Sequence, residues 1–451
     1  MSKSLHSHPL ITGTLVLTDT GIISRIIGFF YRIYLSQLFG PENVGIYQLI
    51  SPILALSFSL TAAGIQTAIS KYVAGETITK DYGYSFKVFF IGTMLSFLIS
   101  IVCAWSIYKN APFLAVHFLL EERCEPLLKL VALSIPLGAI HSCVNGYFYG
   151  LKKTAIPSIT QLLEQTVRVV SVFGLSYYFL KKNIPFSIEL AVLGLVLGEF
   201  VSMLISMIAI LHCFKQKRTE KNFSTRISSF NVSKQILFLA LPLSANRIVL
   251  NFLQSIEAIY IPNKLQAFGF NTSSALSIYG ILTGMALPLI LFPSALTNSI
   301  SVLLLPIVSE AEAANNNKKI VAAVSKTIRY CSVFGLFCTF FFLLLGKWLG
   351  TFLFQSRTAG GFIQTLSFIC PLLYLCSTLS SILHGLGKTH ITFLINLITL
   401  TIRLLFVFCA IPLFGITGYL WGLLISQLIA TILIIIAAYY YTKKAHPLGR
   451  S

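Results

Sequence analysis

Long apolar segments alternate with short polar ones along almost the whole chain. Each apolar segment exceeds 20 residues, enough for a helix to cross a hydrocarbon core of about 30 Å. Polar positions do not alternate with apolar ones inside the segments, so barrel strands are excluded. The pattern predicts an all-α polytopic membrane protein with about twelve transmembrane helices, at residues 11–38, 44–70, 86–108, 127–149, 155–180, 187–214, 234–262, 275–306, 320–346, 362–384, 390–414 and 416–441.

The composition agrees with this class. Hydrophobic residues make up 56% of the chain and charged residues 10%, whereas a soluble domain carries about 25% charged residues. The net charge of +19 arises from topology and not from a nucleic-acid surface, because basic residues concentrate in the loops on one side of the predicted bundle.

Lys and Arg number twenty on that side and eight on the other. The twenty are Lys3, Lys71, Lys80, Lys87, Lys152, Lys153, Lys215, Lys217, Arg218, Lys221, Arg226, Lys234, Lys318, Lys319, Lys326, Arg329, Lys388, Lys443, Lys444 and Arg450. The eight are Lys109, Arg123, Lys129, Lys181, Lys182, Lys264, Lys347 and Arg357. The positive-inside rule therefore places both termini on the cytoplasmic side of the cell membrane.

One segment of the first half recurs 235 residues later. YGLKKTAIPSITQLLEQTVRVVSVF (149–173) aligns without a gap with HGLGKTHITFLINLITLTIRLLFVF (384–408), and both contain a Gly-Leu-x-Lys-Thr turn and an in-register arginine. We therefore predict two pseudo-symmetric six-helix lobes, 1–214 and 234–451, the second with a short cytoplasmic tail, joined by a basic cytoplasmic linker at 215–233. Repeats of this kind are typical of transporters whose halves move around a central site.

Among the charged residues of the predicted helices, nine are candidates for a functional role. An arginine at the centre of a membrane helix costs about 2.5–3.5 kcal/mol on insertion scales, so such residues face the protein interior or water and indicate functional sites. We predict that the arginines bind the substrate and that the acids support them or couple ions. The arginines are Arg25, Arg32, Arg168, Arg247 and Arg403, and the acids are Asp19, Glu164, Glu199 and Glu257.

Four of the arginines are predicted to share one layer of the membrane. Arg25, Arg168, Arg247 and Arg403 each fall about thirteen residues into a helix that starts on the cytoplasmic side, or about 20 Å deep. We expect them to converge on one cavity between the lobes. A guanidinium donates two parallel hydrogen bonds to a phosphate, which makes a pyrophosphate a suitable ligand.

Purely structural ion pairs are the alternative interpretation. Glu164 and Arg168 are one helical turn apart, a spacing that suits such a pair. The position equivalent to Glu164 in the repeat is Thr399, so Arg403 lacks this local carboxylate. That difference favours a cavity in which the arginines bind an anion over purely structural ion pairs.

Other interior residues predict less specific chemistry. Pro288 and Pro293 are expected to interrupt the helix at 275–306, because proline breaks the helical hydrogen-bond ladder. His141 is interpreted as a satisfied interior histidine and not as a proton carrier. The nine cysteines form no disulfide framework or CxxC spacing, so we predict no metal site and no cofactor.

Three stretches carry a resemblance to a known family: TAAGIQTAISKYVAGE (61–76), SIEAIYIPNKLQAFGFNTSSALSIYGILTGMALPLILFPSALTNSISVLLLPIVSEAEA (255–313) and ILHGLGK (382–388). They resemble flippases of the stage V sporulation protein B (SpoVB) type. These belong to the polysaccharide-exporter branch of the multidrug/oligosaccharidyl-lipid/polysaccharide (MOP) superfamily.

The resemblance implies a fold like that of the MATE and MurJ transporters, with two six-helix lobes around a V-shaped cavity. It also implies flipping of an undecaprenyl-linked cell-wall precursor, with membrane lipid and cell-wall synthesis proteins as partners. Lipid II flippases of the MurJ type are more distantly similar. Arg25 lies in SRIIG (24–28), which matches their SRxxG motif, whereas Tyr31 occupies the place of the second motif arginine and Arg32 follows one residue later.

These observations predict an alternating-access flippase or exporter. It would move a lipid-linked (undecaprenyl pyrophosphate) oligosaccharide, a peptidoglycan precursor for spore cortex or cell wall, across the cytoplasmic membrane. The alternative is a multidrug or cation antiporter of the same superfamily, although five arginines against four acids disfavour cationic substrates. An enzyme is not expected, because the largest loop, 215–233, contains one acid, Glu220, and no nucleotide-binding loop is present.

Overall fold

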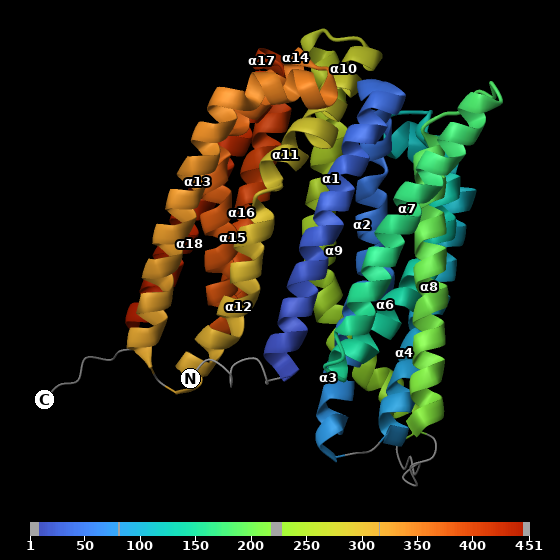
Figure 1. Cartoon of the computed structure of the whole chain (residues 1–451), viewed down its shortest axis with the longest axis vertical. Helices are drawn as coiled ribbons and strands as arrows, with labels where there is room; N and C mark the ends of the chain where they lie inside the picture. The colour runs from blue at the N-terminus through green and yellow to red at the C-terminus, as the bar shows by residue number, and fades with distance from the viewer. Residues whose placement is uncertain (1–8, 80–81, 218–227, 315, 445–451) are drawn as a thin grey trace, which may run out of the picture. The chain divides into compact units, whose positions relative to one another are not determined.

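A computed structural model describes residues 9–79, 82–217, 228–314 and 316–444, and within these ranges every regular element is a helix (Figure 1). The first half contains α1 (Pro9–Leu49), α2 (Ser51–Phe58), the π-helix η1 (Ser59–Ala63), α3 (Gly64–Thr79), α4 (Tyr82–Lys109), α5 (Ala111–Phe113), η2 (Leu114–Phe118), α6 (Cys124–Gly150), α7 (Ala155–Lys181) and α8 (Glu189–Lys217). The second half contains α9 (Ser229–Phe268), α10 (Thr272–Gly280), η3 (Ile281–Ala286), α11 (Leu287–Leu291), α12 (Ser294–Ala313), α13 (Asn317–Phe354), α14 (Arg357–Leu366), α15 (Ile369–Gly385), α16 (Thr389–Leu405), η4 (Phe406–Ala410), α17 (Ile411–Phe414) and α18 (Ile416–Lys444).

The chain divides into two compact units. Unit 1 comprises Met1–Gly28 and Ile46–Ser255, and unit 2 comprises Phe29–Gly45 and Ile256–Ser451. The divisions fall inside α1 and α9, the long first helices of the two halves, and not at the linker 215–233. Residues 218–227 of that linker lie outside the described residues.

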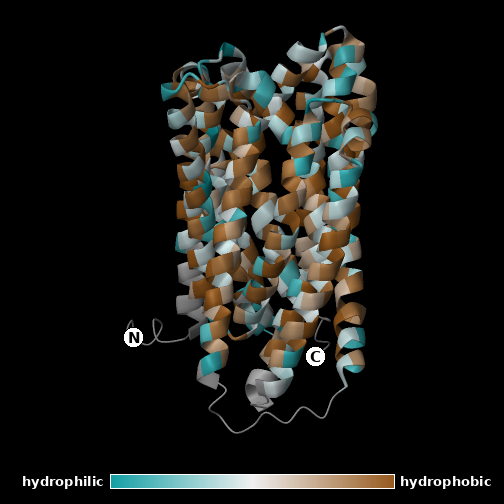
Figure 2. Ribbon diagram, turned by 90° about the vertical axis from the view of Figure 1, so that its right-hand side faces the viewer, coloured by the Kyte–Doolittle hydropathy of each residue, from teal (hydrophilic) through white to brown (hydrophobic). Residues whose placement is uncertain are grey.

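Most helices have the length and composition of membrane spans. In the described ranges ten helices qualify, or eleven when the bent pair α14 and α15 counts as one span. Figure 2 shows apolar residues along most of the helix lengths. The multi-pass all-α membrane fold predicted from the sequence is therefore confirmed.

The difference between twelve predicted spans and ten or eleven has local causes. Asp19–Gly75 counts once, although 57 residues of helix would extend about 85 Å, far more than one crossing. A break at Gly40, with φ 77°, separates the two predicted spans within it. Conversely, the predicted span 275–306 is two helices, because α11 ends at Leu291 and Pro293 precedes α12, as expected from its prolines. The predicted span 155–180 forms α7 but is not among the ten.

The 235-residue repeat is visible in the backbone. After α6, Lys152 has φ 59° and the amide of Lys153 donates to the carbonyl of Phe148 at 2.9 Å. After α15, the equivalent Gly387 has φ 69° and Lys388 donates to Leu383 at 2.9 Å. Both turns are Schellman caps, in which a left-handed residue lets a later amide satisfy a carbonyl of the last helical turn. The shared turn of the alignment is thus the same structure in each unit.

The glycine of each turn marks an equivalent close contact between helices. A Cβ on Gly150 would lie 2.7 Å from the carbonyl oxygen of Ser70, and one on Gly385 would lie 2.9 Å from that of Leu305. Ser70 and Leu305 are themselves 235 residues apart. The repeat therefore extends to the way α6 packs on α3 and α15 packs on α12.

We expect Gly150→Ala and Gly385→Ala to destabilise the protein by about 1–3 kcal/mol each, because the added methyl must push two helices apart. Thermal unfolding in detergent would measure the loss. Gly361→Ala is the matched control, since nothing lies within 4 Å of a Cβ there and alanine favours a helix. Equal unfolding midpoints for Gly150→Ala, Gly385→Ala and the control would contradict the close contacts.

A proline explains the bend between α14 and α15, which is 56°. Pro371 has no amide hydrogen, so it cannot bond the carbonyl of Ser367 one turn earlier. The hydroxyl of Thr339 on α13 donates to this carbonyl instead, at 2.9 Å. Gly335, one turn before Thr339, leaves room for the proline, because a Cβ there would lie 2.3 Å from Pro371. The bend is therefore fixed by α13.

Candidate functional site

In unit 1, Arg168 is held by an acid on its own helix. The guanidinium donates to Glu164 Oε1 at 2.5 Å, and the two side chains are 16% and 14% exposed. Helix α8 approaches closely here, because a Cβ on Gly198 would lie 2.8 Å from the carbonyl of Glu164 and one on Gly194 would lie 3.0 Å from that of Arg168. Small residues four apart commonly bring membrane helices this close. The ion pair thus lies at the crossing of α7 and α8.

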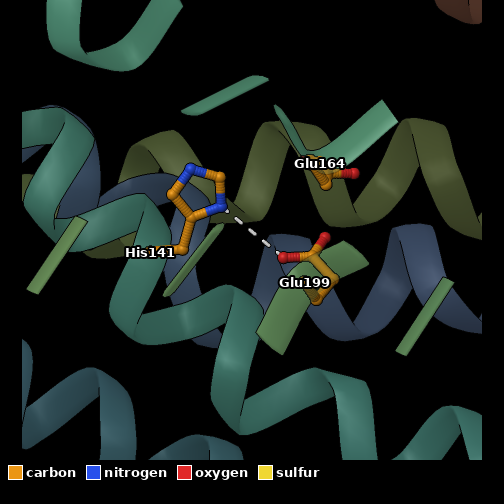
Figure 3. Close-up of side chains that lie close together, drawn as sticks. All are labelled: His141, Glu164 and Glu199. Atoms are coloured by element: carbon orange, nitrogen blue, oxygen red, sulfur yellow. Dashed lines mark ion pairs between the residues drawn. The ribbon is translucent and has the colours of Figure 1, made fainter. Parts of the chain in front are cut away.

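A histidine and a second acid join this pair. His141 from α6, Glu164 from α7 and Glu199 from α8 bring their ligand atoms within 4.8 Å of one another (Figure 3). His141 Nδ1 lies 3.5 Å from Glu199 Oε2. These three side chains have donor atoms that suit a metal ion, but the guanidinium of Arg168 already occupies Glu164 and would repel one. We call His141, Glu164, Arg168 and Glu199 the unit 1 cluster.

His141 is buried among polar partners. Its Nε2 lies 2.8 Å from the amide nitrogen of Asn145, 3.0 Å from Ser202 Oγ and 3.3 Å from Thr160 Oγ1. His141 therefore has hydrogen-bond partners in the interior, as expected from the sequence. Sequence analysis did not, however, foresee that an acid lies beside it.

Glu199 reaches a cavity inside unit 1. The cavity measures about 320 Å³ and is lined by η1 and α2 on one side and by α6 and α8 on the other, with Glu199 as its acidic residue. Glu199 Oε2 is buried and accepts no hydrogen bond from the described residues. It packs against Gly138, where a Cβ would lie 3.5 Å away. An unsatisfied carboxylate oxygen therefore lies at the wall of a space large enough for water.

In unit 2, Arg403 is held by an acid from a distant helix. Its Nε donates to Glu257 Oε1 at 2.6 Å, and the hydroxyl of Tyr419 donates to the same oxygen at 2.6 Å. Arg403 Nη2 also lies 3.4 Å from the Tyr419 hydroxyl oxygen. The side chain of Glu257 is 4% exposed and that of Arg403 is 27% exposed. We call Glu257, Arg403 and Tyr419 the unit 2 cluster.

This arrangement corrects one step of the sequence argument. Arg403 lacks a carboxylate one turn away, since Thr399 occupies that place and donates to its own helix at 2.7 Å. It is nevertheless paired, because α9 supplies Glu257 from 146 residues away. The repeat thus conserves a paired guanidinium in each unit while the source of the carboxylate differs.

The common depth of the four arginines stays a prediction, because a position counted along a helix does not give a depth in the membrane. Arg168 lies thirteen residues after the first residue of α7, and Arg403 lies fourteen after the first residue of α16. Arg25 and Arg247 lie sixteen and eighteen residues into α1 and α9. Those two helices begin before the apolar segment does, which the hydrophobic pattern alone cannot indicate.

The remaining predicted site residues are not in either cluster. Asp19, Arg25, Arg32 and Arg247 have exposed side chains in the described structure. Sequence analysis also missed Tyr419, whose signal would have been a tyrosine amid the otherwise apolar span 416–441. The structure therefore groups Glu164, Arg168 and Glu199 with His141, and Glu257 and Arg403 with Tyr419.

Comparison with known proteins gives these clusters a context. The family described as polysaccharide biosynthesis protein matches residues 10–312, more than half of the chain. The chain belongs to this family. Stage V sporulation protein B of Bacillus subtilis is 28% identical over 428 residues, which cover 93% of this chain and 82% of that protein.

A second relative and a solved structure extend the comparison. Lipid II flippase MurJ of Bacillus subtilis is 23% identical over 345 residues, covering 72% of this chain and 62% of that protein. The inward-facing structure of a multidrug resistance MATE family transporter of the MOP superfamily has a TM-score of 0.69 at 16% identity, covering 97% of this chain and 99% of that one. The chain therefore shares the fold of this transporter, which is the MATE-like fold that its sequence predicts.

Proposed function

We propose that this transporter flips a lipid-linked oligosaccharide carrying a pyrophosphate, as a peptidoglycan precursor does, across the cytoplasmic membrane. One observation carries the proposal. Each unit holds a guanidinium among its membrane helices, at repeat-equivalent positions, Arg168 and Arg403. Because a buried arginine is costly, its presence in both copies of the repeat favours a role in transport. The similarity to stage V sporulation protein B and to a lipid II flippase supports the substrate class.

The clusters suit transient contact with an anion. Glu257 and Tyr419 hold the Arg403 guanidinium in place, while 27% of its side chain stays exposed. A positioned guanidinium loses little side-chain entropy when it donates to a phosphate, so recognition costs less. We further propose that Arg25, Arg32 and Arg247, which are exposed, contact the same anionic headgroup during its passage, with Asp19 and the buried acids balancing their charge.

The membrane potential can supply part of the driving force. An inside-negative potential favours outward movement of a dianion by about 4–5 kcal/mol per 100 mV. The polyprenyl tail stays in lipid while the headgroup crosses. No chemical bond changes in this process, so the proposed function is transport without catalysis.

Orientation is testable at the two ends of α7. Lys153 precedes this helix and Lys182 follows it, and both side chains are exposed. We propose that the end at Lys153 is cytoplasmic, in agreement with the charge bias that puts both termini inside. In intact cells a membrane-impermeant thiol reagent should label Lys182→Cys and not Lys153→Cys, with wild type as the background. The reverse pattern would overturn the topology.

Reconstitution tests the function directly. The full-length protein in liposomes should accelerate transfer of an undecaprenyl-pyrophosphate-linked fluorescent oligosaccharide between leaflets, compared with protein-free liposomes. Transfer of a neutral lipid that carries the same glycan but no pyrophosphate should not be accelerated, because this lipid lacks the charge that the arginines recognise. Equal rates for both lipids, or no acceleration of the charged one, would refute the proposal.

Cation antiport is the second candidate, favoured by the acidic lining that Glu199 gives to the cavity in unit 1. In the same liposomes, a lipophilic cationic dye would then be moved against its gradient. Dye transport without lipid transfer would replace the flippase by an antiporter. Lipid transfer without dye transport is the outcome that we expect.

A further inference from the structure

The unit 1 cluster has an unbalanced charge unless it carries a proton. Glu164 and Glu199 contribute two carboxylates, and Arg168 contributes one guanidinium. With a neutral imidazole at His141 the net charge is −1, in a helical bundle whose surroundings are mostly apolar. An uncompensated charge in such a place is strongly unfavourable. One bound proton makes the cluster neutral.

The surroundings of His141 suit the protonated ring. The Thr160 hydroxyl donates to the carbonyls of Ile156 and Pro157, at 3.1 and 3.0 Å, and the Ser202 hydroxyl donates to the carbonyl of Thr160 at 3.2 Å. Their oxygens therefore face His141 as acceptors. Glu199 is an acceptor on the side of Nδ1, at 3.5 Å. Acceptors on both sides of the ring match an imidazolium, which donates from both nitrogens.

Asn145 can serve both forms of the ring. As placed, its amide nitrogen lies 2.8 Å from Nε2 and can donate to a neutral imidazole. Its amide oxygen is buried and has no hydrogen-bond partner among the described residues. Turning the amide over would bring this oxygen to Nε2, where it accepts from the charged ring. The site therefore accommodates gain and loss of one proton without leaving the histidine unsatisfied.

The cavity gives this proton a route. Glu199 lies in its wall, and its unsatisfied Oε2 is also the carboxylate atom nearest to His141 in the pair. The lining contributed by α2 and η1, from Leu54 to Thr61, carries no acid, base or tyrosine in the described structure. The charged or titratable side chains that face the site are thus His141 from α6, Glu164 and Arg168 from α7 and Glu199 from α8.

We propose that the unit 1 cluster is a proton-binding site that holds one exchangeable proton between His141 and Glu199. Water in the cavity delivers the proton to the carboxylate of Glu199 and His141 accepts it, so that the cluster changes from a charge of −1 to neutral. No other bond forms or breaks. Glu164 and Arg168 balance each other and fix the second carboxylate beside the pair.

A metal ion fits this site less well than a proton. A divalent cation would leave the cluster with a net charge of +1 and would approach the guanidinium of Arg168, which contacts Glu164. Sodium would balance the charge, but hard cations prefer oxygen ligands to an imidazole nitrogen. The second step of the proposal, that this proton is coupled to transport, rests on the proposed function, whereas proton binding itself does not.

Proton binding can be measured on the purified full-length protein without any substrate. Proton uptake would be recorded with a pH indicator between about pH 9 and about pH 5, a range that brackets the ordinary titration of histidine. We expect Glu199→Gln to take up about one proton fewer than wild type, since it makes the cluster neutral without a proton, and His141→Asn to take up about one fewer because it removes the group that accepts the proton. Glu125→Gln is the matched control, an acid on α6 paired with Lys129 at 2.7 Å, and should leave the uptake in this range unchanged.

Nitrogen-15 NMR of the histidine rings keeps the test independent of folding losses. The ring signal of His141 is identified by its absence from the spectrum of His141→Asn. In wild type this signal should shift with pH, and in Glu199→Gln it should shift over a different pH range. His384→Asn provides the comparison for a histidine that bonds a threonine at 2.7 Å. A His141 ring that stays neutral throughout, or proton uptake that neither variant reduces, would overturn the proposal. So would stoichiometric zinc or sodium binding in calorimetry that both variants abolish.

Transport in liposomes separates coupling from binding. An imposed pH gradient should change the rate of lipid transfer several-fold in wild type and leave it unchanged in Glu199→Gln. If the two variants take up about one proton fewer than wild type but wild type transfers no lipid, the proposed function fails and the proton site stands. If lipid is transferred at the same rate with and without a gradient, coupling is refuted.

Discussion

Glu257→Gln should lower the free energy of unfolding by about 3 kcal/mol, because removing one partner of a buried ion pair leaves the other charge unpaired. The carboxylate is 4% exposed and accepts hydrogen bonds from Arg403 and Tyr419 on the same oxygen, each at 2.6 Å. Glutamine keeps the shape but cannot neutralise the guanidinium. Thermal unfolding in detergent, followed by intrinsic fluorescence, would measure the effect.

A double variant separates charge from packing. Glu257→Gln combined with Arg403→Gln removes both charges and should recover most of the lost stability. Glu122→Gln, an exposed acid in a loop, should unfold like wild type. Tyr419→Phe removes one hydrogen bond and should cost about 1 kcal/mol. If Glu257→Gln unfolds at the wild-type temperature, the carboxylate does not hold Arg403.

Much of the fold could be predicted because its causes are local in sequence. The length of each apolar segment determines that it forms a membrane helix, and the turn chemistry after α6 and α15 determines the left-handed residues at Lys152 and Gly387. Pro293 likewise divides the predicted span 275–306. These features depend on a few neighbouring residues. They therefore appear in the pattern of the chain itself.

The site was predicted less completely, because its contacts join distant helices. Periodicity indicates which face of a helix is polar but not which helix packs against that face. Glu257 and Arg403 are 146 residues apart, and no repeat signal connects them. Glu164 and Arg168, one turn apart, were predicted as a pair and form one. His141 was recognised as buried, but its neighbour Glu199 comes from another helix.

Arg168→Lys and Arg403→Lys should each reduce transfer of the pyrophosphate-linked lipid about tenfold or more while leaving protein levels near wild type. Lysine keeps the positive charge and can still pair with Glu164 or Glu257, so the ion pairs should survive. It cannot present the planar fork that donates two parallel hydrogen bonds to one phosphate. A lost charge-assisted hydrogen bond is worth about 1.5–3 kcal/mol, which corresponds to a tenfold or larger change in binding.

The readout must distinguish recognition from stability. Arg329→Lys, at an exposed position of α13, provides a matched control and should transfer lipid like wild type. Binding of the pyrophosphate-linked lipid should weaken in Arg403→Lys, whereas binding of a neutral lipid with the same glycan should not. Glu164→Gln should reduce transport less than Arg168→Lys, because the acid positions the guanidinium and does not contact the substrate. A normally expressed Arg403→Lys protein that transfers lipid at the wild-type rate would show that the guanidinium is structural. Recognition of the pyrophosphate would then have to rest on the exposed arginines Arg25, Arg32 and Arg247.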